Sequence, residues 1–269
     1  MENDRPSSTA TLIAAATVYL AADPRFARLV PEGAAEVCAR CLPPARRSAV
    51  RALSHPALRW AARLAERATV PGLLEHFMLR KRWIEAAVRT ALASGCEQVA
   101  IIGAGFDTLA ARLAPEFPRA RFIEVDHPAS QAAKRRAVSH VNLEFVAADL
   151  ARTRLPDALA GTGYRANASS VFIIEGLLMY LSDAEVAALF AALGELQRAR
   201  GDVVFTVMEG ADFHNATALV RRLLARWSEP FKSALGRDDV PAFLAPFGLE
   251  LRKLATPAIG EMLVHATRR

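Results

Sequence analysis

Hydrophobic residues before about position 71 recur at helical spacing, and prolines interrupt them. Alanine and leucine dominate these stretches, which predicts separate helices over 9–22, 34–53 and 56–69. The interruptions are Pro24, Pro31, Pro43, Pro44, Pro56 and Pro71. We therefore expect residues 1–71 to form an N-terminal helical cap in front of a larger domain, 72–269.

The larger domain begins with a longer amphipathic helix, about 72–94, which leads into a series of short apolar runs. The runs expected to be strands lie near 99–102, 121–125, 142–147, 171–174, 202–207, 249–255 and 261–267. Helical stretches separate most of them, and the last two are expected to join as a hairpin around Pro257–Gly260. Strands that alternate with helices predict an α/β fold with a doubly wound sheet.

Capping residues mark the start of one helix in this domain. Ser182 and Glu185 have the spacing of a capping box, in which each side chain accepts a hydrogen bond from the other residue's backbone N–H. We therefore expect a helix to begin at Asp183.

The composition fits a protein that buries a large core without help from disulfides or metal. Of the 269 residues, 52% are hydrophobic. The net charge of +6 and the pI of about 9.7 raise the question of a nucleic-acid partner. Only four of the 34 basic residues are lysines, however, and the arginines are scattered with few aromatic residues between them. That distribution disfavours a surface that tracks phosphates and stacks bases, so we expect no nucleic-acid partner.

The N-terminus and the cysteines indicate a cytoplasmic protein. The chain begins Met-Glu-Asn-Asp without a basic leader, and the apolar stretch Leu12–Ala22 is too short to span a bilayer. Three cysteines do not make a disulfide framework. Cys38 and Cys41 lack the second pair or the histidines of a zinc site, so we expect them to be buried small hydrophobic residues. Neither a membrane partner nor a metal site is expected.

The segment Val99–Thr108 indicates a cofactor, because an apolar strand here runs into a glycine turn that opens a helix. Gly103 and Gly105 lack a Cβ, so the backbone can adopt unusual dihedral angles and approach a ligand closely. The next strand carries Glu124 and Asp126, where a carboxylate could accept hydrogen bonds from ribose hydroxyls. Asp126 follows Gly105 by 21 residues, the interval expected for a nucleotide-like cofactor.

Two cofactor classes share this geometry, and the turn separates them. A nicotinamide fingerprint needs a third glycine where this chain has Thr108. Asp107 is expected in the first turn of the helix, where a carboxylate suits the helix dipole but would repel a diphosphate. S-adenosylmethionine has no phosphate and carries a cationic sulfonium, so the sequence favours this methyl donor.

From Phe77 to Leu181 the chain resembles the S-adenosylmethionine-dependent methyltransferases of the leucine carboxyl methyltransferase family, in its bacterial branch. The matching blocks are LRKRWIE (79–85), IIGAGFDTLAARL (101–113), FIEVDHPASQAAKRR (122–136), AADL (147–150) and EGLLMYLS (175–182). Each block alone is a weak signal, but their order and spacing together are specific. The resemblance implies a seven-stranded, Rossmann-like methyltransferase sheet and S-adenosyl-L-methionine as the cofactor.

The resemblance also implies a set of cofactor-binding residues. They are Arg80 for the donor's carboxylate, Gly103 and Gly105 for its methionine end, Asp126 for the ribose, Asp149 and Leu150 beside the adenine, and Glu175 to close the pocket. Lys81 is a departure, because bacterial members usually have threonine there.

Alternatives remain for several of these residues. Without the resemblance, Asp149 could simply cap a helix in its loop, and the basic run around Arg80 could be a solvated helix face. The resemblance leaves Arg82 structural and Glu124 a supporting partner of Asp126. Glu175 follows a buried strand, where an unpaired carboxylate would be costly, so we expect it to have a ligand or a partner.

Methyl transfer asks the protein mainly for positioning, because the sulfonium is already a good leaving group. A carboxylate acceptor needs no base, whereas a hydroxyl acceptor needs a group that takes its proton. The leading candidate for this catalytic base is His214, expected in the loop after the fifth strand, with His76 and His127 as weaker candidates. The alternative for each histidine, a surface or core residue without a role, has the greater weight.

The sequence thus predicts an S-adenosylmethionine-dependent O-methyltransferase that acts on a hydroxyl or carboxyl oxygen of a small molecule, such as a secondary metabolite. Two alternatives remain open. One is carboxyl methylation of a protein or peptide C-terminus, and the other is a module that binds the cofactor without chemistry. Acceptor-dependent formation of S-adenosylhomocysteine would separate an enzyme from a module.

Overall fold

One sheet organises the computed structural model of this chain, which describes residues 6–69, 71–210, 232–256 and 260–268. Its strands are β1 (Gln98–Ile102), β2 (Arg121–Asp126), β3 (Leu143–Ala147), β4 (Ser170–Ile174), β5 (Gly201–Met208), β6 (Glu250–Ala255) and β7 (Glu261–Arg268). Their order across the sheet is β3-β2-β1-β4-β5-β7-β6. The first five are parallel, and β7 runs antiparallel to both of its neighbours. The expected seven-stranded α/β sheet is confirmed.

The helices follow the predicted pattern closely. They are α1 (Ser8–Ala21), α2 (Ala34–Cys41), α3 (Pro44–Leu53), α4 (Pro56–Thr69), α5 (Leu73–Ala93), α6 (Leu109–Glu116), α7 (Pro128–Ala137), α8 (Leu155–Leu159), α9 (Asp183–Leu196) and α12 (Val240–Leu244), with short 3₁₀ turns η1 (Ala27–Leu29), η2 (Leu178–Tyr180) and η3 (Ala245–Phe247). The two prolines at 43 and 44 divide the expected stretch 34–53 into α2 and α3. Helix α9 begins at Asp183 behind the complete capping box, as predicted.

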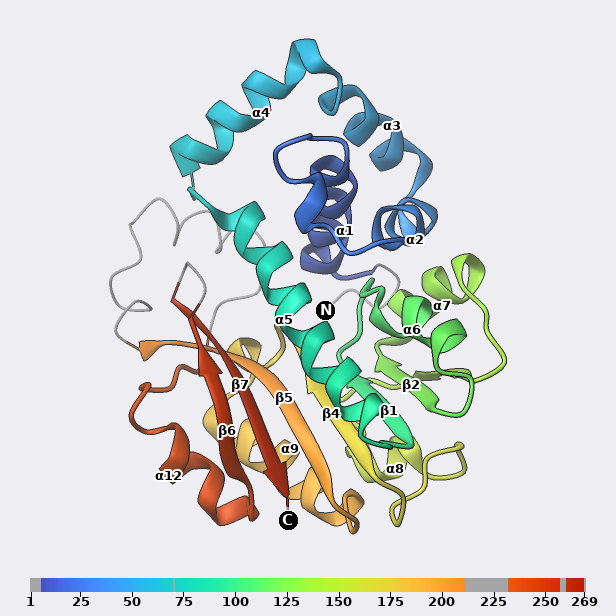
Figure 1. Cartoon of the computed structure of the whole chain (residues 1–269), viewed down its shortest axis with the longest axis vertical. Helices are drawn as coiled ribbons and strands as arrows, with labels where there is room; N and C mark the ends of the chain where they lie inside the picture. Colours follow the sequence, from blue (N-terminus) through green and yellow to red (C-terminus); the bar gives the residue numbers. More distant parts are fainter. Residues whose placement is uncertain (1–5, 70, 211–231, 257–259, 269) are drawn as a thin grey trace.

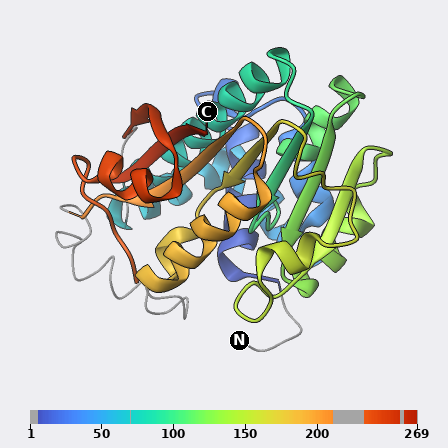
Figure 2. The same cartoon turned by 90° about the horizontal axis from the view of Figure 1, so that it is seen from below.

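Alternate residues of the strands serve two separate cores, one on each face of the sheet. Val99 and Ile101 pack with α5 and α6, whereas Ala100 and Ile102 pack with α8, α9 and α12. Figure 2 shows the sheet between these two layers of helices. The central parallel strands are buried on both sides, so their carboxyl ends are the accessible place for a ligand site.

The N-terminal helices lie over the edge of the sheet where the parallel strands end (Figure 1). Ala14 of α1 and Cys38 of α2 share a hydrophobic cluster with Phe106, which belongs to the turn after β1. Cys38 and Cys41 are both buried and unpaired, as expected from the sequence. The proposed boundary between a cap and a second domain at residue 71 stays a prediction. None of the helices among the described residues has the combination of length and apolar character that a membrane crossing requires.

Candidate cofactor-binding site

The glycine turn after β1 is enclosed from two directions. Gly103 and Gly105 have φ angles of 71° and 48°, in the left-handed region that favours glycine. A Cβ on Gly103 would lie 3.1 Å from the side chain of Leu177, and a Cβ on Gly105 would lie 3.0 Å from Ala10 of α1. The backbone here therefore runs close to the loop after β4 on one side and to the first helix on the other.

Asp126, at the end of β2, is joined to this turn. One of its carboxylate oxygens accepts a 2.6 Å hydrogen bond from the Gly105 N–H, and the other accepts one of 2.6 Å from the His127 N–H. Each oxygen keeps a further lone pair, which is what a ribose hydroxyl would use. His127 itself caps α7, because its Nδ1 accepts from the Ala129 N–H at 3.3 Å. Its ring therefore has a structural contact.

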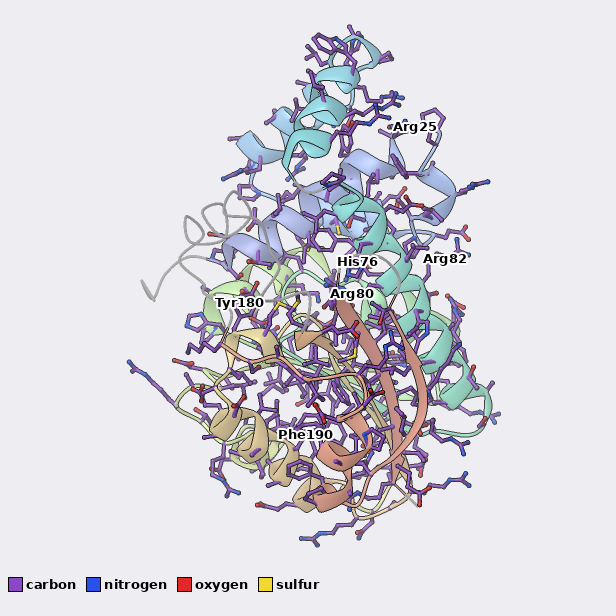
Figure 3. The ribbon with its side chains drawn as sticks, turned by 90° about the vertical axis from the view of Figure 1, so that its left-hand side faces the viewer. Arg25, His76, Arg80, Arg82, Tyr180 and Phe190 are labelled. Atoms are coloured by element: carbon purple, nitrogen blue, oxygen red, sulfur yellow. The ribbon has the colours of Figure 1, made fainter. Side chains whose placement is uncertain are left out.

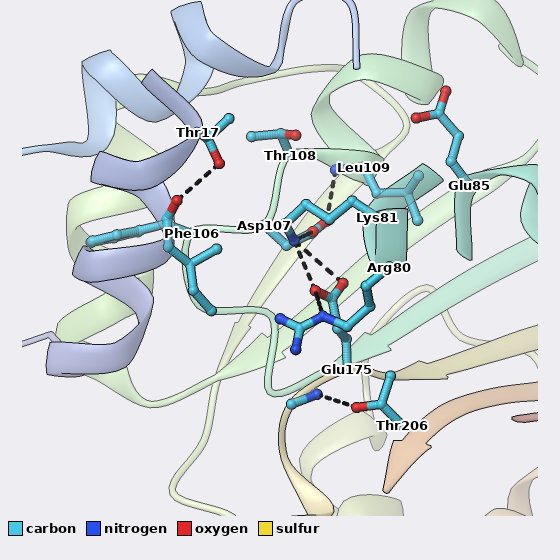
Figure 4. Close-up of polar contacts among 12 residues, drawn as sticks. Thr17, Arg80, Lys81, Glu85, Phe106, Asp107, Thr108, Leu109, Glu175 and Thr206 are labelled. Atoms are coloured by element: carbon cyan, nitrogen blue, oxygen red, sulfur yellow. Dashed lines mark hydrogen bonds and ion pairs between the residues drawn. The ribbon is translucent and has the colours of Figure 1, made fainter. Parts of the chain in front are cut away.

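Two neighbouring cations of α5 form the centre of a buried charged cluster (Figure 4). Arg80 Nε donates to Glu175 at 2.9 Å, and Lys81 Nζ lies 3.0 Å from the same carboxylate oxygen. Lys81 also donates to Asp107 at 2.6 Å. Arg80 and Lys81 are only 3% and 8% exposed. The expectation that Glu175 has a partner is confirmed, and it has two.

The cluster extends to β7 through residues that the sequence did not single out together. Arg80 Nη1 donates to both oxygens of Glu261, at 3.1 and 2.8 Å. His76 Nε2 lies 2.6 Å from the same carboxylate, and its Nδ1 has no hydrogen-bond partner among the described residues. Figure 3 places His76 and Arg80 together between the N-terminal helices and the sheet. A carboxylate that orients an imidazole can fix which ring nitrogen carries the proton.

The charges of this cluster stabilise one another against burial. Burial alone would raise the pKa of Glu261, but Arg80 and His76 outweigh it and lower that pKa to about 2. Lys81 likewise holds the pKa of Asp107 well below its usual value despite desolvation. Burial would lower the pKa of Lys81, yet the carboxylates of Asp107 and Glu175 raise it. These shifts keep Glu261, Asp107 and Lys81 ionised at neutral pH.

One detail of the expected turn is wrong. Asp107 does not lie in the first turn of a helix, because α6 begins at Leu109 with Thr108 as its N-cap residue. Instead, the Asp107 carboxylate accepts a 2.7 Å hydrogen bond from the Leu109 N–H while it pairs with Lys81. A short side chain that bonds the backbone two residues ahead favours a turn over a helix at its own position. Its negative charge still lies at the helix N-terminus.

The remaining candidates are distributed around this edge. Asp149 lies in the loop after β3, where its side chain accepts from the Ala151 N–H at 3.1 Å, six residues before α8 begins. Leu150 packs against the core on that side. Arg82 is exposed, and its Nη1 donates to the Arg28 carbonyl at 2.6 Å. His214 lies outside the described residues.

Glu124 faces away from solvent and pairs with Lys134 of α7. Both side chains are 0% exposed, and the charged atoms approach to 2.5 Å. Burial raises the pKa of Glu124 to about 7, against the opposing effect of Lys134. Glu124 thus links β2 to α7, two residues before Asp126 in the same strand.

The arrangement fits the amino-acid end and the ribose of S-adenosylmethionine. The glycine turn offers a close backbone approach that a Cβ would block, and Asp126 has free acceptor capacity. Arg80 donates to carboxylates through Nε and Nη1. A guanidinium has five N–H donors, so it can also bind a carboxylate group of the donor.

Comparison with known proteins gives the same identification. The family model described as leucine carboxyl methyltransferase matches residues 8–194. A Streptomyces coelicolor protein, provisionally named as an S-adenosyl-L-methionine-dependent methyltransferase, is 40% identical over 44% of this chain and 43% of its own length. A Bacillus subtilis protein with the same provisional name is 27% identical over 67% of this chain and 62% of its own length. The matches thus span about half of these curated relatives.

A solved structure agrees with the fold over the whole chain. A Thermobifida fusca protein, provisionally named as a methyltransferase, superposes with a TM-score of 0.60 at 16% identity and covers 100% of this chain and 97% of its own. The expected cofactor, S-adenosyl-L-methionine, is confirmed by the curated relatives. This chain belongs to the leucine carboxyl methyltransferase family.

Proposed function

We propose that this protein transfers a methyl group from S-adenosylmethionine to an oxygen atom of a small-molecule acceptor. The observation that carries the proposal is the buried cluster of Arg80, Lys81 and Glu175 beside the glycine turn. Burying several charges is costly unless they are paired, so a cluster of this size at the ligand edge of an α/β sheet favours a binding role. The family name supports an oxygen acceptor, because a carboxyl group is methylated on oxygen.

We assign each part of the site to one part of the cofactor. Arg80 binds the carboxylate of the amino-acid end, Glu175 binds the ammonium, and Asp126 accepts from the ribose hydroxyls. Asp149 and Leu150 lie beside the adenine, and the turn at Gly103 and Gly105 admits the methionine chain. When bound, S-adenosylmethionine supplies an activated methyl group. The protein's task is then to exclude water and to align the acceptor oxygen with that group.

The acceptor decides whether a base is required. A carboxylate acceptor needs none, and a hydroxyl acceptor needs a group that accepts its proton. For a hydroxyl we propose His214, on sequence grounds. His214→Ala should then lower turnover by about 100-fold without changing donor affinity, and activity should recover at high pH. Turnover of a phenol or alcohol that ignores this substitution would eliminate His214 as the base.

Ligand binding tests the cofactor in this chain directly. S-adenosylhomocysteine should raise the melting temperature, because a ligand at a hundredfold excess over its dissociation constant stabilises the folded state by about 2.7 kcal/mol. NADH should give no shift. A shift with NADH and none with S-adenosylhomocysteine would overturn the proposal.

Activity measurements distinguish the remaining alternatives. Acceptor-dependent formation of S-adenosylhomocysteine from small phenols, alcohols or acids supports the proposed function. Methylation only of peptide C-termini would favour a protein substrate instead. Cofactor binding without turnover of either class would favour a binding module. A cytoplasmic location and a secondary-metabolite acceptor are parts of the same proposal and rest on the sequence.

A further inference from the structure

Lys81 lies where two carboxylates from neighbouring strands converge. Its Nζ is 2.6 Å from Asp107, in the turn after β1, and 3.0 and 3.3 Å from the two oxygens of Glu175, directly after β4. Strands β1 and β4 are adjacent and parallel, so both carboxylates belong to the carboxyl edge of the sheet. The ammonium is nearly buried, with its side chain 8% exposed.

The amino-acid end of S-adenosylmethionine carries the same functional group as a lysine side chain. Its α-ammonium has a single positive charge and three N–H donors, and it requires a carboxylate or carbonyl partner. Among the acidic groups described at this edge, Glu261 is held by Arg80 and His76, and both oxygens of Asp126 accept backbone N–H groups. Glu175 and Asp107 already bind an ammonium, the one of Lys81.

We infer that the Lys81 ammonium occupies, in the free protein, the position that the α-ammonium of the donor takes on Glu175, and that the donor displaces it. The inference rests on the proposed function, since it needs the donor at this edge. The flexible stem of Lys81 allows its Nζ to leave Glu175 and to keep Asp107, its closer partner. Arg80 remains available for the donor's carboxylate throughout.

This exchange weakens binding of donor and product alike. The free cluster contains two cations, Arg80 and Lys81, and three carboxylates, so the carboxylates are largely neutralised before the ligand arrives. Threonine at position 81 would leave Glu175 and Asp107 with one positive charge fewer. The donor's ammonium would then meet a more negative site and would displace nothing.

The test compares ligands with and without the amino-acid end. Titration calorimetry would measure the dissociation constants of S-adenosylhomocysteine and 5′-methylthioadenosine for the wild type and for Lys81→Thr. We expect Lys81→Thr to bind S-adenosylhomocysteine about tenfold more tightly or better, the size of one hydrogen bond to a charged group. Its affinity for 5′-methylthioadenosine, which lacks the ammonium, should be unchanged.

Two further variants keep the experiment decisive. Arg82→Thr removes the next, exposed cation of the same helix and should change neither affinity. Lys81→Gln keeps a hydrogen-bond donor near Asp107 but removes the charge, so it repeats the measurement if the threonine variant does not fold. Melting temperatures should fall in the free Lys81 variants and rise more on adding S-adenosylhomocysteine than they do in the wild type.

Each other outcome has a definite meaning. Weaker binding of S-adenosylhomocysteine alone in the Lys81 variants would make Lys81 a direct ligand of the donor's carboxylate and overturn the exchange. Equal affinities in all variants would reduce Lys81 to a structural ion pair and also overturn it. A wild type that binds neither ligand would instead contradict the proposed function itself.

Discussion

Two groups of buried charges lie one strand apart in this molecule, and they are built differently. In the pair of Glu124 and Lys134, one cation meets one carboxylate, and both side chains are 0% exposed. In the cluster around Arg80 and Lys81, each cation contacts two carboxylates, and Glu175 contacts both cations. The first group lies between β2 and α7, whereas the second lies at the ends of the strands.

The difference fits a structural role for the Glu124–Lys134 pair and the proposed binding role for the cluster around Arg80 and Lys81. We call Glu124 and Lys134 the sealed pair: it has no open side from which a ligand could replace either partner, so it contributes to the fold. We call the group around Arg80 and Lys81 the shared cluster: it can lose one contact and keep the rest, so a charged ligand can enter without leaving a buried group unpaired. Burial and charge alone do not distinguish the two groups, whereas the number of partners for each charge does.

The largest expected effect is on stability, at the sealed pair. Lys134→Met should lower the free energy of unfolding by about 3–5 kcal/mol, because it leaves a buried carboxylate without its cation. Chemical denaturation at pH 8 would measure it. The affinity of the folded variant for S-adenosylhomocysteine should remain that of the wild type.

The double variant Glu124→Gln/Lys134→Met is the matched control for that experiment. It removes both charges, so it should recover much of the lost stability. If Lys134→Met is as stable as the wild type, or if it loses donor affinity while stable, then the sealed pair does not have the structural role given to it here.

The second effect is on binding, at the shared cluster. Arg80→Ala should weaken S-adenosylhomocysteine binding by about 1.5–3 kcal/mol, the range for hydrogen bonds to charged groups. Arg82→Ala should change binding little, since that side chain is exposed and bonds the Arg28 carbonyl. Calorimetry on both variants gives the comparison. Equal losses would mean that the run of basic residues acts only as a diffuse positive field.

A smaller effect tests the enclosure of the glycine turn. Gly105→Ala should destabilise the protein by about 1–2 kcal/mol, because alanine is strained at a φ of 48° and its Cβ would press on Ala10 at 3.0 Å. Gly161→Ala is the control, because Gly161 also has a positive φ, 75°, but a Cβ there meets nothing within 4 Å. Thermal unfolding of both variants would separate the cost of backbone strain, which both share, from the cost of the contact with Ala10, which only Gly105→Ala has. Indistinguishable losses would deny the contact with α1.

The contributions of Glu124 and Glu261 to stability should depend on pH with opposite signs. Glu124 has a pKa raised from 4.5 to about 7, so the folded state binds more protons than the unfolded state between these values. Its contribution to stability therefore declines as the pH rises through that window. Glu261 has a pKa lowered from 4.5 to about 2, so its contribution is present above 4.5 and is lost as the pH falls toward 2.

Unfolding free energies measured from pH 3 to 8 would check both signs. Relative to the wild type, Glu124→Gln should flatten the decline on the neutral side and leave the acid side unchanged. A decline between pH 4.5 and 7 that persists in Glu124→Gln would assign it to another group.

The sequence predicted the fold well because each strand is marked locally. Apolar runs bounded by helical stretches placed all seven strands, and the capping box placed the start of α9. The prediction failed at Asp107, whose side chain accepts a hydrogen bond from the Leu109 N–H, so that the helix begins only at Leu109. Hydrophobic periodicity does not indicate whether a side chain will bond the backbone in this way.

The sequence predicted individual site residues within motifs but not the contacts between motifs. Arg80 and Glu175 come from separate blocks of the sequence, and the structure brings them into contact. Glu261 was missed because its contact with Arg80 spans 181 residues and depends on register. Strand β7 is antiparallel and pairs Glu261 with Met208 at the end of β5, which delivers the carboxylate to the ligand edge. A lone glutamate at the start of an apolar strand was the available signal.

The different roles of Glu124 and Asp126 also could not be predicted from the strand pattern alone. Residues two apart in a strand share a face, so strand geometry does not distinguish the two carboxylates. Their partners distinguish them, since Glu124 meets Lys134 of α7 and Asp126 meets two backbone N–H groups. Those partners come from packing that a strand pattern does not contain.

A crystal structure with S-adenosylhomocysteine bound would show which of the two groups of charges meets the ligand. We expect the ribose hydroxyls on Asp126, the carboxylate on Arg80, and the ammonium on Glu175 with Lys81 moved from that carboxylate. The contact between Glu124 and Lys134 should be unchanged. A ligand bound elsewhere, or a bound ligand that opens the Glu124–Lys134 pair and leaves the shared cluster intact, would contradict this expectation.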